Sequence, residues 1–536
     1  MLSLYLFLSA LFLIAPLNLT GAYPSFGIVS RPASKNCCVK QISCNDKAYT
    51  YEGIAGYGYV PSDAVDKYQD TLGGFGSSIA LDRSTWRRNH DGSYDGILWT
   101  LPDRGWNTNG TINYNPRIHK FSIHFEPKPH ATVANPSSRN LHFNYLDTIL
   151  FTGPDGHPTT SLDADVTGNI TYVGFPELPV ATYTGDGFGG EGMGGQRIAI
   201  DSEGLVLNED GSFWVSDEYG PYIYKFSKKG RMQHAIQPPQ AYLPRRNGSV
   251  SFSANSPPHY DQNKVTAPAD TQSGRTNNHG FEGLTVSPDR KYLYALLQSA
   301  LAQEGGQKKR TRKQARLLEY DISGSTPIFS REFVVTLPRY KPGKSKKTKT
   351  GHKEEVASQS EIHCIGANQF LVLSRDSGAG RGQDNTKSVY RHVDIFTLPP
   401  LSNATDIKSH SNDGVNSSIA FSKGKLHSNI VATTYCPFLD YNVNSELDKF
   451  KLHNGGVSNK HLLNEKWESL ATAPVDGKDG ADGEFYLFSL SDNDFMTQDG
   501  YMNFGNFRYS DESGYDIDSQ ALVFKIKLPN GDASVS

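Results

Sequence analysis

The chain has 536 residues, with 51 glycines, 28 tyrosines and 27 phenylalanines but only 5 methionines, a composition that favours a β-rich protein. Its formal net charge of −3 at pH 7 provides no global excess of basic residues, and we find no DNA-reading motif, so no nucleic-acid partner is expected. This length favours two or more domains as a prior, although a single all-β structure can be this large.

An apolar run occupies residues 4–17 and only Ser9 interrupts it; small residues follow as far as Ala22. This pattern predicts a secretory signal peptide over residues 1–22, although the usual basic start is missing. The run is short for a membrane span of roughly 20 residues, so an uncleaved anchor is the less favoured alternative. We expect a chain exported through the secretory pathway, extracellular or in the cell wall, with no membrane span in the mature protein.

Residues 23–48 form an N-terminal segment that holds three of the five cysteines, Cys37, Cys38 and Cys44. The other two are Cys364 and Cys436. Five is too few for a disulfide scaffold, and an odd number leaves at least one thiol unpaired or intermolecular. We expect one disulfide within the N-terminal three and a buried, reduced thiol at Cys364.

The presence of N-glycosylation sequons is consistent with export through the secretory pathway. Five Asn-x-Ser/Thr sequons follow the leader, and these are Asn109, Asn169, Asn247, Asn403 and Asn416. Such triplets also arise by chance in a chain rich in Asn, Ser and Thr, so they permit glycosylation without requiring it.

A four-strand unit recurs along the chain. Each copy opens with a glutamate before a short apolar strand, and a second strand then ends in an acid or, once, in Gln298. The copies begin at Glu203, Glu282, Glu361 and Glu468, and the first two intervals are both 79 residues. An N-terminal relative of this unit begins at Ser78 and lacks the glutamate.

Two further strand-like runs follow within the first two of these intervals, and four strands per repeat is typical of propeller blades. The sequence therefore predicts an all-β fold, a β-propeller of four-stranded blades over residues 49–530. Six blades are expected and five to seven are compatible, with residues 51–55 and 140–185 supplying the sixth. A β-sandwich is the alternative, but that fold would not require the same four-strand unit to recur along the chain.

Blade topology predicts where the acids meet. In a propeller the start of the first strand and the end of the second lie on the same face. The glutamates occupy the first position, and four aspartates occupy the second: Asp103, Asp217, Asp376 and Asp492. We therefore expect both sets to ring one mouth of the central channel.

Long insertions open on the same face, over residues 238–279, 301–316 and 340–356. Two of them are strongly basic, and the residues expected to bind an anionic substrate are Lys308, Lys309, Arg310, Lys346 and Lys347. Positive loops above an acidic mouth would attract an anionic ester.

Crowded carboxylates repel one another unless they are protonated or neutralised, and a hard cation such as Ca²⁺ accepts six to eight oxygen ligands. Ca²⁺ is therefore the expected cofactor, with candidate ligands Glu203, Glu282, Glu361, Glu468, Asp103, Asp376 and Asp492. For each aspartate, a purely turn-forming role is the alternative.

Such an ion would polarise a phosphoryl or carbonyl oxygen while a nearby carboxylate deprotonates water. The residues expected to catalyse are Glu203, Glu282, Asp217, His279, Arg104 and Arg375. An ordinary loop histidine, and structural Arg–Asp pairs, are the alternatives for the last three.

Several short sequence motifs resemble those of a known family. They are Asp103-Arg104-Gly105, Glu203-Gly-Leu, and residues 216–221, 280–284 and 490–495. Together they resemble the domain called esterase-like activity of phytase, over residues 51–528. This resemblance implies hydrolysis of phosphate or carboxylic esters.

Two function classes remain open. The first is a secreted, metal-assisted ester hydrolase, monomeric, acting on an anionic small-molecule or polymer ester, with phosphate esters as the leading substrate. The second is a non-catalytic propeller that binds a cell-wall polymer or a protein partner through the same face. No Gly-x-Ser-x-Gly, His-Glu-x-x-His or Arg-His-Gly motif occurs, so the sequence does not support a covalent serine or histidine mechanism.

Overall fold

β-Strands provide almost all of the regular structure. The computed structural model describes residues 39–343, 353–408 and 413–529. The expected signal peptide, Cys37, Cys38, Lys346 and Lys347 lie outside the described residues. The all-β prediction is confirmed for the part of the chain that is described.

Four groups of four antiparallel strands follow one another in chain order. The first comprises β3 (Ser78–Arg88), β4 (Tyr94–Leu101), β5 (Arg117–Phe125) and β6 (Leu141–Leu150). The second comprises β10 (Ser202–Leu207), β11 (Phe213–Asp217), β12 (Ile223–Phe226) and β13 (Met232–Ile236). The third comprises β16 (Phe281–Val286), β17 (Tyr292–Leu297), β18 (Gln314–Asp321) and β19 (Ile328–Thr336). The fourth comprises β22 (Ser358–Gly366), β23 (Gln369–Arg375), β24 (Arg391–Thr397) and β25 (Thr434–Asp440).

A fifth group joins the two ends of the chain. It comprises β27 (Ala471–Pro474), β28 (Glu484–Asp492), β31 (Ser519–Lys527) and the N-terminal β2 (Lys47–Val60). A single parallel pair between Gly58 of β2 and Leu141 of β6 merges this group with the first into one ten-stranded sheet.

The segments expected to supply a sixth blade lie in part in other strand groups. Residues 51–55 belong to β2, the outer strand of the fifth group, and part of 140–185 forms β6, the outer strand of the first. The physical reason is that β2 covers the edge of β31 that its pairing with β28 leaves open.

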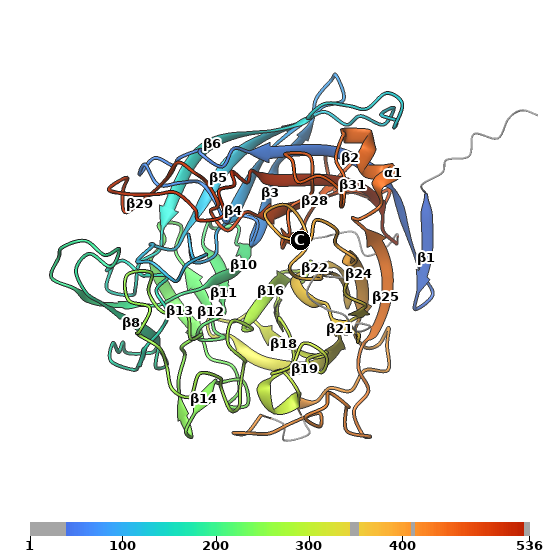
Figure 1. Ribbon diagram of the computed structural model, residues 1–536. Coiled ribbons are helices and arrows are strands. Elements are labelled where there is room, and N and C mark those ends of the chain that lie inside the picture. Colours follow the sequence, from blue (N-terminus) through green and yellow to red (C-terminus); the bar gives the residue numbers. More distant parts are fainter. Residues whose placement is uncertain (1–38, 344–352, 409–412, 530–536) are drawn as a thin grey trace, which may run out of the picture. The chain divides into compact units, whose positions relative to one another are not determined.

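The first strands of the groups lie nearest a common centre, where β3, β10, β16 and β22 are seen in Figure 1. Residues of these four strands and of β27 line one cavity of about 70 Å³. Apolar side chains fill the space between neighbouring groups: Trp214 of the second packs with Leu293 of the third, and Tyr294 of the third with Phe370 of the fourth. This is the strand arrangement that a propeller requires.

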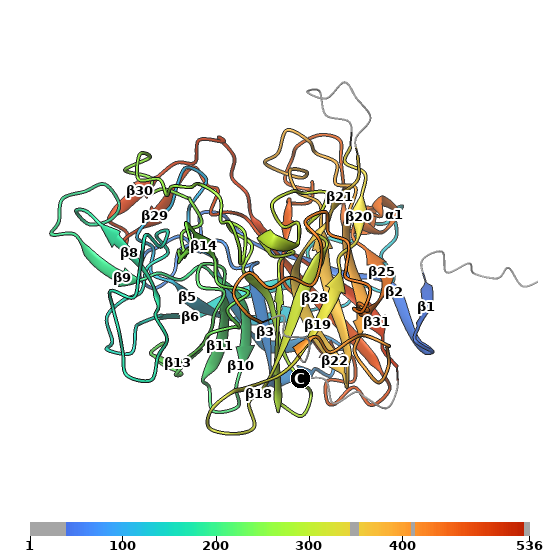
Figure 2. The same cartoon turned by 90° about the horizontal axis from the view of Figure 1, so that it is seen from below.

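Shorter elements decorate this framework. The strands are β1 (Lys40–Cys44), β7 (Val166–Thr167), β8 (Pro179–Tyr183), β9 (Gly195–Ile198), β14 (Arg245–Arg246), β15 (Ser249–Val250), β20 (Arg339–Tyr340), β21 (Glu355–Val356), β26 (Lys466–Trp467), β29 (Gly500–Met502) and β30 (Phe507–Tyr509). The helices are η1 (Ala302–Glu304), α1 (Asn444–Leu447) and η3 (Asp448–Phe450). Figure 2 shows β14, β20, β21, β29 and β30 toward the same end of the long strands. No helix in the described ranges is long and apolar enough to cross a membrane.

The disulfide differs from the expected one. Cys44 at the end of β1 bonds to Cys436 of β25, and not to Cys37 or Cys38. The reason is that β1 pairs with β2 and lies beside β25, where Lys40 Nζ donates to the carbonyl of Phe438 at 2.7 Å. The other part of the expectation is confirmed: Cys364 is buried and unbonded, and burial raises the pKa of its thiol to about 12.

Candidate functional site

Glu203 and Glu282 each stand next to a glycine near the start of an inner strand. The pairing register of β10 with β11 shifts between Ser202 and Leu205, and that of β16 with β17 shifts at the same place. An irregularity of this kind turns a side chain away from the regular strand alternation. A Cβ on Gly204 would lie 2.4 Å from the Cβ of Leu284, so glycine permits the two inner strands to pack this closely.

Asp201, Glu203 and Glu218 form a buried group that we call the acidic triad. One carboxylate oxygen from each lies within 4.8 Å of the others, and the residues are 0%, 7% and 1% exposed. Asp201 precedes β10 and Glu218 follows β11. The backbone N–H of Glu218 donates to the carbonyl of Asp201 at 2.9 Å, which fixes the two chain segments side by side.

The triad carries carboxylate oxygens that accept no hydrogen bond within the described part of the chain. These are both oxygens of Asp201 and Oε2 of Glu218. The cation paired with the triad is Arg104, whose Nη1 lies 3.2 Å from Asp201 Oδ2. Lys466 and Arg275 also act on Asp201 from farther away, but Arg104 makes the ion pair with the triad. Negative charge is therefore in excess unless the carboxyls hold protons or a cation.

Glu282 lies beside the triad. Gln298 Nε2 donates to its Oε1, while its Oε2 accepts no hydrogen bond within the described residues. Burial raises the pKa of Glu282 well above its usual range, and Glu218 and Glu468 raise it further. The pKa of Glu203 is raised in the same way by burial and then by Glu282. Glu203, Glu218 and Glu282 therefore interact electrostatically.

The other members of the triad also resist ionisation. Burial and the neighbouring Asp201 raise the pKa of Glu218 to about 8. Burial also raises the pKa of Asp201, although Arg104 opposes this. Without a cation, the triad holds at least one proton at neutral pH.

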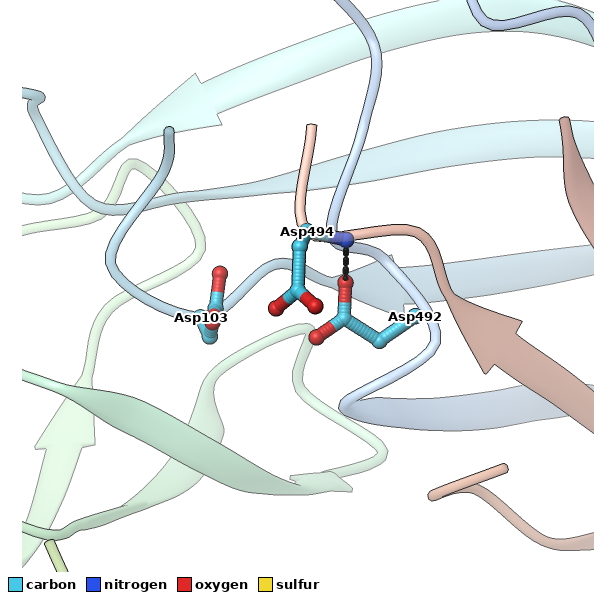
Figure 3. Close-up of side chains that lie close together, drawn as sticks. All are labelled: Asp103, Asp492 and Asp494. Carbon is cyan, nitrogen blue, oxygen red and sulfur yellow. Dashed lines mark hydrogen bonds between the residues drawn. The ribbon is translucent and has the colours of Figure 1, made fainter. Parts of the chain in front are cut away.

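A second group of acids, Asp103, Asp492 and Asp494, lies close by, with oxygens within 4.8 Å of one another. Figure 3 shows their carboxylates converging, with the backbone N–H of Asp494 donating to Asp492 Oδ1 at 2.7 Å. The Lys466 ammonium contacts all three, at 3.8 Å from Asp103 Oδ2, 2.9 Å from Asp494 Oδ1 and most closely at Asp492. Lys466 thus occupies the position that a metal ion would need.

Two features hold Lys466 in this position. On the backbone, β26 pairs with β28 so that Lys466 lies opposite Asp492. Burial alone would lower the pKa of the ammonium, but the surrounding carboxylates, Asp492 first, raise it well above its usual range. Lys466 is therefore a fixed positive charge.

Glu468 also acts on Glu282, but two cations already neutralise its charge. Arg375 bonds to its Oε1, and Lys466 Nζ lies 3.6 Å from its Oε2. The predicted ligand Glu468 and the predicted catalytic Arg375 thus form an ion pair with each other.

Glu361 does not join these acids. Its Oε2 is hydrogen-bonded to Ser78 Oγ at 2.6 Å, and its Oε1 accepts from the backbone N–H groups of Leu284 at 3.1 Å and Ile362 at 2.8 Å. Both oxygens of the Glu361 carboxyl group are engaged in hydrogen bonds. The expected ligand role of Glu361 therefore has no support in the geometry.

Asp217 and Asp376 have the turn-forming role that the sequence left open as the alternative for each aspartate. Asp217 accepts from the backbone N–H groups of Asp201, Tyr219 and Gly220, and from Tyr224 Oη. Asp376 accepts from Ser388 Oγ at 2.6 Å and from the N–H of Val389 at 2.7 Å. Both carboxylates order the chain after a second strand.

His279 is held between Asn277 and Arg312. Its Nδ1 lies 2.9 Å from the carbonyl of Asn277, and its Nε2 is bonded to Arg312. Burial and the Arg312 charge lower the pKa of His279 to about 3, so the imidazole is neutral. A neutral ring with both nitrogens engaged is not placed to act as a general acid.

The basic loop residues Lys308, Lys309 and Arg310 are exposed. They lie in the β17–β18 connection, which begins next to Gln298, the donor to Glu282. The positive charge expected on this face is therefore present in the described loop.

Asp201, Glu218, Asp494 and Lys466 were not among the expected site residues. Two of them had a signal in the sequence, because Glu218 and Asp494 lie inside the family phrases 216–221 and 490–495. Asp201 stands two residues before Glu203, and Lys466 stands two before Glu468. A search for charged neighbours of the repeated glutamates would have found both.

The acidic triad fits a hard divalent cation. Its donors are carboxylate oxygens, three of them accept no hydrogen bond within the described residues, and the ion pair with Arg104 compensates the buried negative charge only in part. The second acidic group does not fit, because Lys466 already lies among its oxygens.

The expected glycosylation sites lie at the surface. Asn169, Asn247, Asn403 and Asn416 are exposed, whereas Asn109 is half-buried and its amide donates to Glu512 Oε1 at 2.9 Å. Glycosylation at these asparagines stays a prediction.

Successive β-sheets and a group of buried acids define an all-β protein with a candidate cation site. The chain belongs to the phytase-like family described as esterase-like activity of phytase, which matches residues 71–495. A relative from Arthroderma benhamiae, named an uncharacterized secreted protein, is 58% identical over 470 residues, 86% of this chain and 90% of the relative. The predicted secretion is thereby confirmed.

Solved structures are much more distant. A luciferin-regenerating enzyme is 11% identical, with a TM-score of 0.25, over 87% of this chain and 96% of that one. A putative 6-phosphogluconolactonase from Bacteroides uniformis is 11% identical, with a TM-score of 0.23, over 89% and 94%. A gluconolactonase from Xanthomonas campestris is 8% identical, with a TM-score of 0.21, over 89% and 98%.

Proposed function

We propose that the chain is a five-bladed β-propeller and a secreted, metal-assisted hydrolase that acts on phosphate esters. The five groups of strands around one cavity support the fold. Membership of the phytase-like family supports ester hydrolysis.

The acidic triad is the observation that carries this proposal. Asp201, Glu203 and Glu218 bury three carboxyls that a single arginine cannot neutralise. We assign Ca²⁺ to this group, because an all-oxygen carboxylate donor set suits a hard cation. A cation bound there would polarise the ester oxygen and draw the anionic substrate to the mouth.

The chain's own residues would supply orientation and proton transfer. Arg104 has Nε and Nη1 atoms that donate no hydrogen bond within the described residues, and its side chain is 12% exposed, so it can orient a phosphate oxygen. Burial raises the pKa of Glu282 well above its usual range, so its Oε2 would be suited to give a proton to the leaving alkoxide. Gln298 would keep the Glu282 carboxyl in place through Oε1.

The basic residues of one loop favour an anionic substrate. Lys308, Lys309 and Arg310 lie on the connection next to Gln298 and are exposed. Their long-range field would speed capture of a phosphate ester at low ionic strength.

Hydrolysis of p-nitrophenyl phosphate and phytate by the secreted protein tests this proposal, with Ca²⁺ and with a chelator. Activity should require the cation and should fall at least about 100-fold in Glu203→Gln and Glu282→Gln. Glu209→Gln is the matched control, because Glu209 is an exposed glutamate in the β10–β11 turn, at the opposite end of the same strands. Activity that persists in chelator, or in both variants, would contradict the proposal. No activity in the wild type would favour the non-catalytic binding function.

A further inference from the structure

We propose that a second site, a basic groove at the rim of the third strand group, binds an acidic polysaccharide. The groove is separate from the acidic triad, and the inference does not depend on hydrolysis. Its charged and imidazole side chains are Lys313, Arg339, Lys423, Lys425 and His427.

The groove lies where three chain segments meet. Lys313 precedes β18, Arg339 belongs to β20 just after β19, and residues 423–428 form a turn in the long connection between β24 and β25. That connection runs along the outer edge of β19, where the N–H of Thr433 donates to the carbonyl of Val334 at 2.8 Å. Ile419 and Ile430 pack against Val334 and secure the segment.

Close packing fixes the turn that carries Lys423 and Lys425. Gly424 has a φ of +73°, and a Cβ there would lie 2.1 Å from the carbonyl oxygen of Thr311. Gln314 Nε2 also donates to the carbonyl of Gly424 at 3.1 Å. The two lysines are therefore held beside Lys313 by contacts to the backbone.

Charge in the groove is of one sign. None of the described residues that line it is acidic, and the ion pair of Arg339 with Glu354 is long, at 3.9 Å. Burial and the neighbouring Arg339 lower the pKa of Lys313, which shows that two like charges are crowded together. Since the whole chain has a net charge of −3, this is a local concentration of positive charge.

The form of the groove favours a polymer. Lys423, Lys425 and Arg339 are exposed, so each contact with a single small anion would be weak and screened by salt. A chain with repeated negative charges can contact several of them at once, and its affinity then grows with the number of contacts.

The side chains also favour a sugar polymer with carboxylates. Phe421 is 58% exposed, and its ring meets that of His427 edge-on at 4.8 Å, which leaves an aromatic face beside the lysines for a sugar ring. Lysine is a compact point charge that suits dispersed carboxylates, whereas arginine forks favour bidentate phosphate contacts. A secreted protein meets acidic polysaccharides outside the cell.

Binding to immobilised polygalacturonate tests this inference, with neutral dextran and single-stranded RNA as the comparison polymers. We expect binding of polygalacturonate that weakens as salt rises from about 50 to about 300 mM. Lys423→Gln/Lys425→Gln should reduce that affinity about tenfold, because two exposed charge pairs are lost. Phe421→Ser should reduce it as well, at all salt concentrations.

The matched control is Lys228→Gln/Lys229→Gln, which removes two exposed lysines from the β12–β13 turn. This variant should bind polygalacturonate like the wild type, and hydrolysis of p-nitrophenyl phosphate should be unchanged in both double variants. Equal loss in the two double variants, no binding by the wild type, or tighter binding of RNA than of polygalacturonate would each overturn the inference. Loss of activity in Glu203→Gln with polymer binding retained would separate this site from the proposed catalytic one.

Discussion

Glu361 of β22 reaches across the central channel to Ser78 of β3, with Glu361 Oε2 and Ser78 Oγ 2.6 Å apart. The two strands are not neighbours around the channel, because β3 contacts β10 and β27, whereas β22 contacts β16. Glu361 also accepts from the backbone of Leu284 on β16. This one side chain therefore ties together three of the five inner strands.

The Glu361 carboxyl should make stability depend on pH. Burial raises its pKa well above the usual range, so the folded protein keeps this proton where the unfolded chain has lost it. The contribution is complete below the unfolded pKa, about 4.3, and is lost as the pH rises toward the folded value. Glu361→Gln should remove that contribution, and the fall in unfolding free energy with rising pH should be smaller than in the wild type.

Denaturant unfolding at a series of pH values measures this difference. Glu361→Ala is the contrasting variant, and it should lose about 2–5 kcal/mol at every pH because it leaves a cavity and unpaired donors. Equal slopes in the wild type and in Glu361→Gln would show that the carboxyl is ionised in the folded protein.

Lys466 should be essential to the second acidic group. Lys466→Gln leaves Asp103, Asp492 and Asp494 without their cation, and we expect a loss of about 3–5 kcal/mol of unfolding free energy. Calcium should restore part of this loss, because the vacated position among three carboxylates then suits a cation. Thermal unfolding with and without Ca²⁺ measures both effects.

Lys525→Gln is the control for that substitution. Lys525 also bridges two acids, Glu52 and Glu484, but its side chain is 31% exposed, so its loss should cost about 0–1 kcal/mol. A Lys466→Gln protein as stable as Lys525→Gln would contradict the assignment of Lys466 as a buried counter-charge.

The Cys44–Cys436 disulfide should stabilise the junction between the fourth and fifth groups. It links β1 to β25 across 392 residues of sequence, and its removal in Cys436→Ser should cost about 2–5 kcal/mol. Peptide mapping should recover this pair from the native protein. Cys364 is buried and should react with thiol reagents only after unfolding, so rapid labelling of Cys364 in the native state would contradict the fold around it.

The repeat made the strands and the acidic face predictable from sequence, because alternating apolar residues and a repeated glutamate are local signals. The contacts that each glutamate makes in the folded protein were not predictable in the same way. Glu203 and Glu282 are followed by glycine, whereas Glu361 is followed by Ile362, whose N–H donates back to it. Its partner Ser78 stands where the first copy of the repeat lacks the glutamate, so the pairing is a long-range event between copies.

Lys466 and the disulfide were missed for a related reason. The position of Lys466 depends on the pairing of β26 with β28, and the disulfide depends on where β1 lies beside β25. Both follow from contacts between segments far apart in the chain. The place of Lys466 two residues before Glu468 marks it as a charged neighbour, but it does not encode the contacts of Lys466 with Asp103 and Asp492.

Calorimetric titration of the metal-free protein with Ca²⁺ tests the proposal that Asp201, Glu203 and Glu218 bind one divalent cation. We predict one site per chain, with affinity reduced at least about tenfold in Glu203→Gln and in Glu218→Gln because each removes a charged ligand, and unchanged in Glu209→Gln. Absence of Ca²⁺ binding by the wild type, or equal affinity in all four proteins, would contradict the claim.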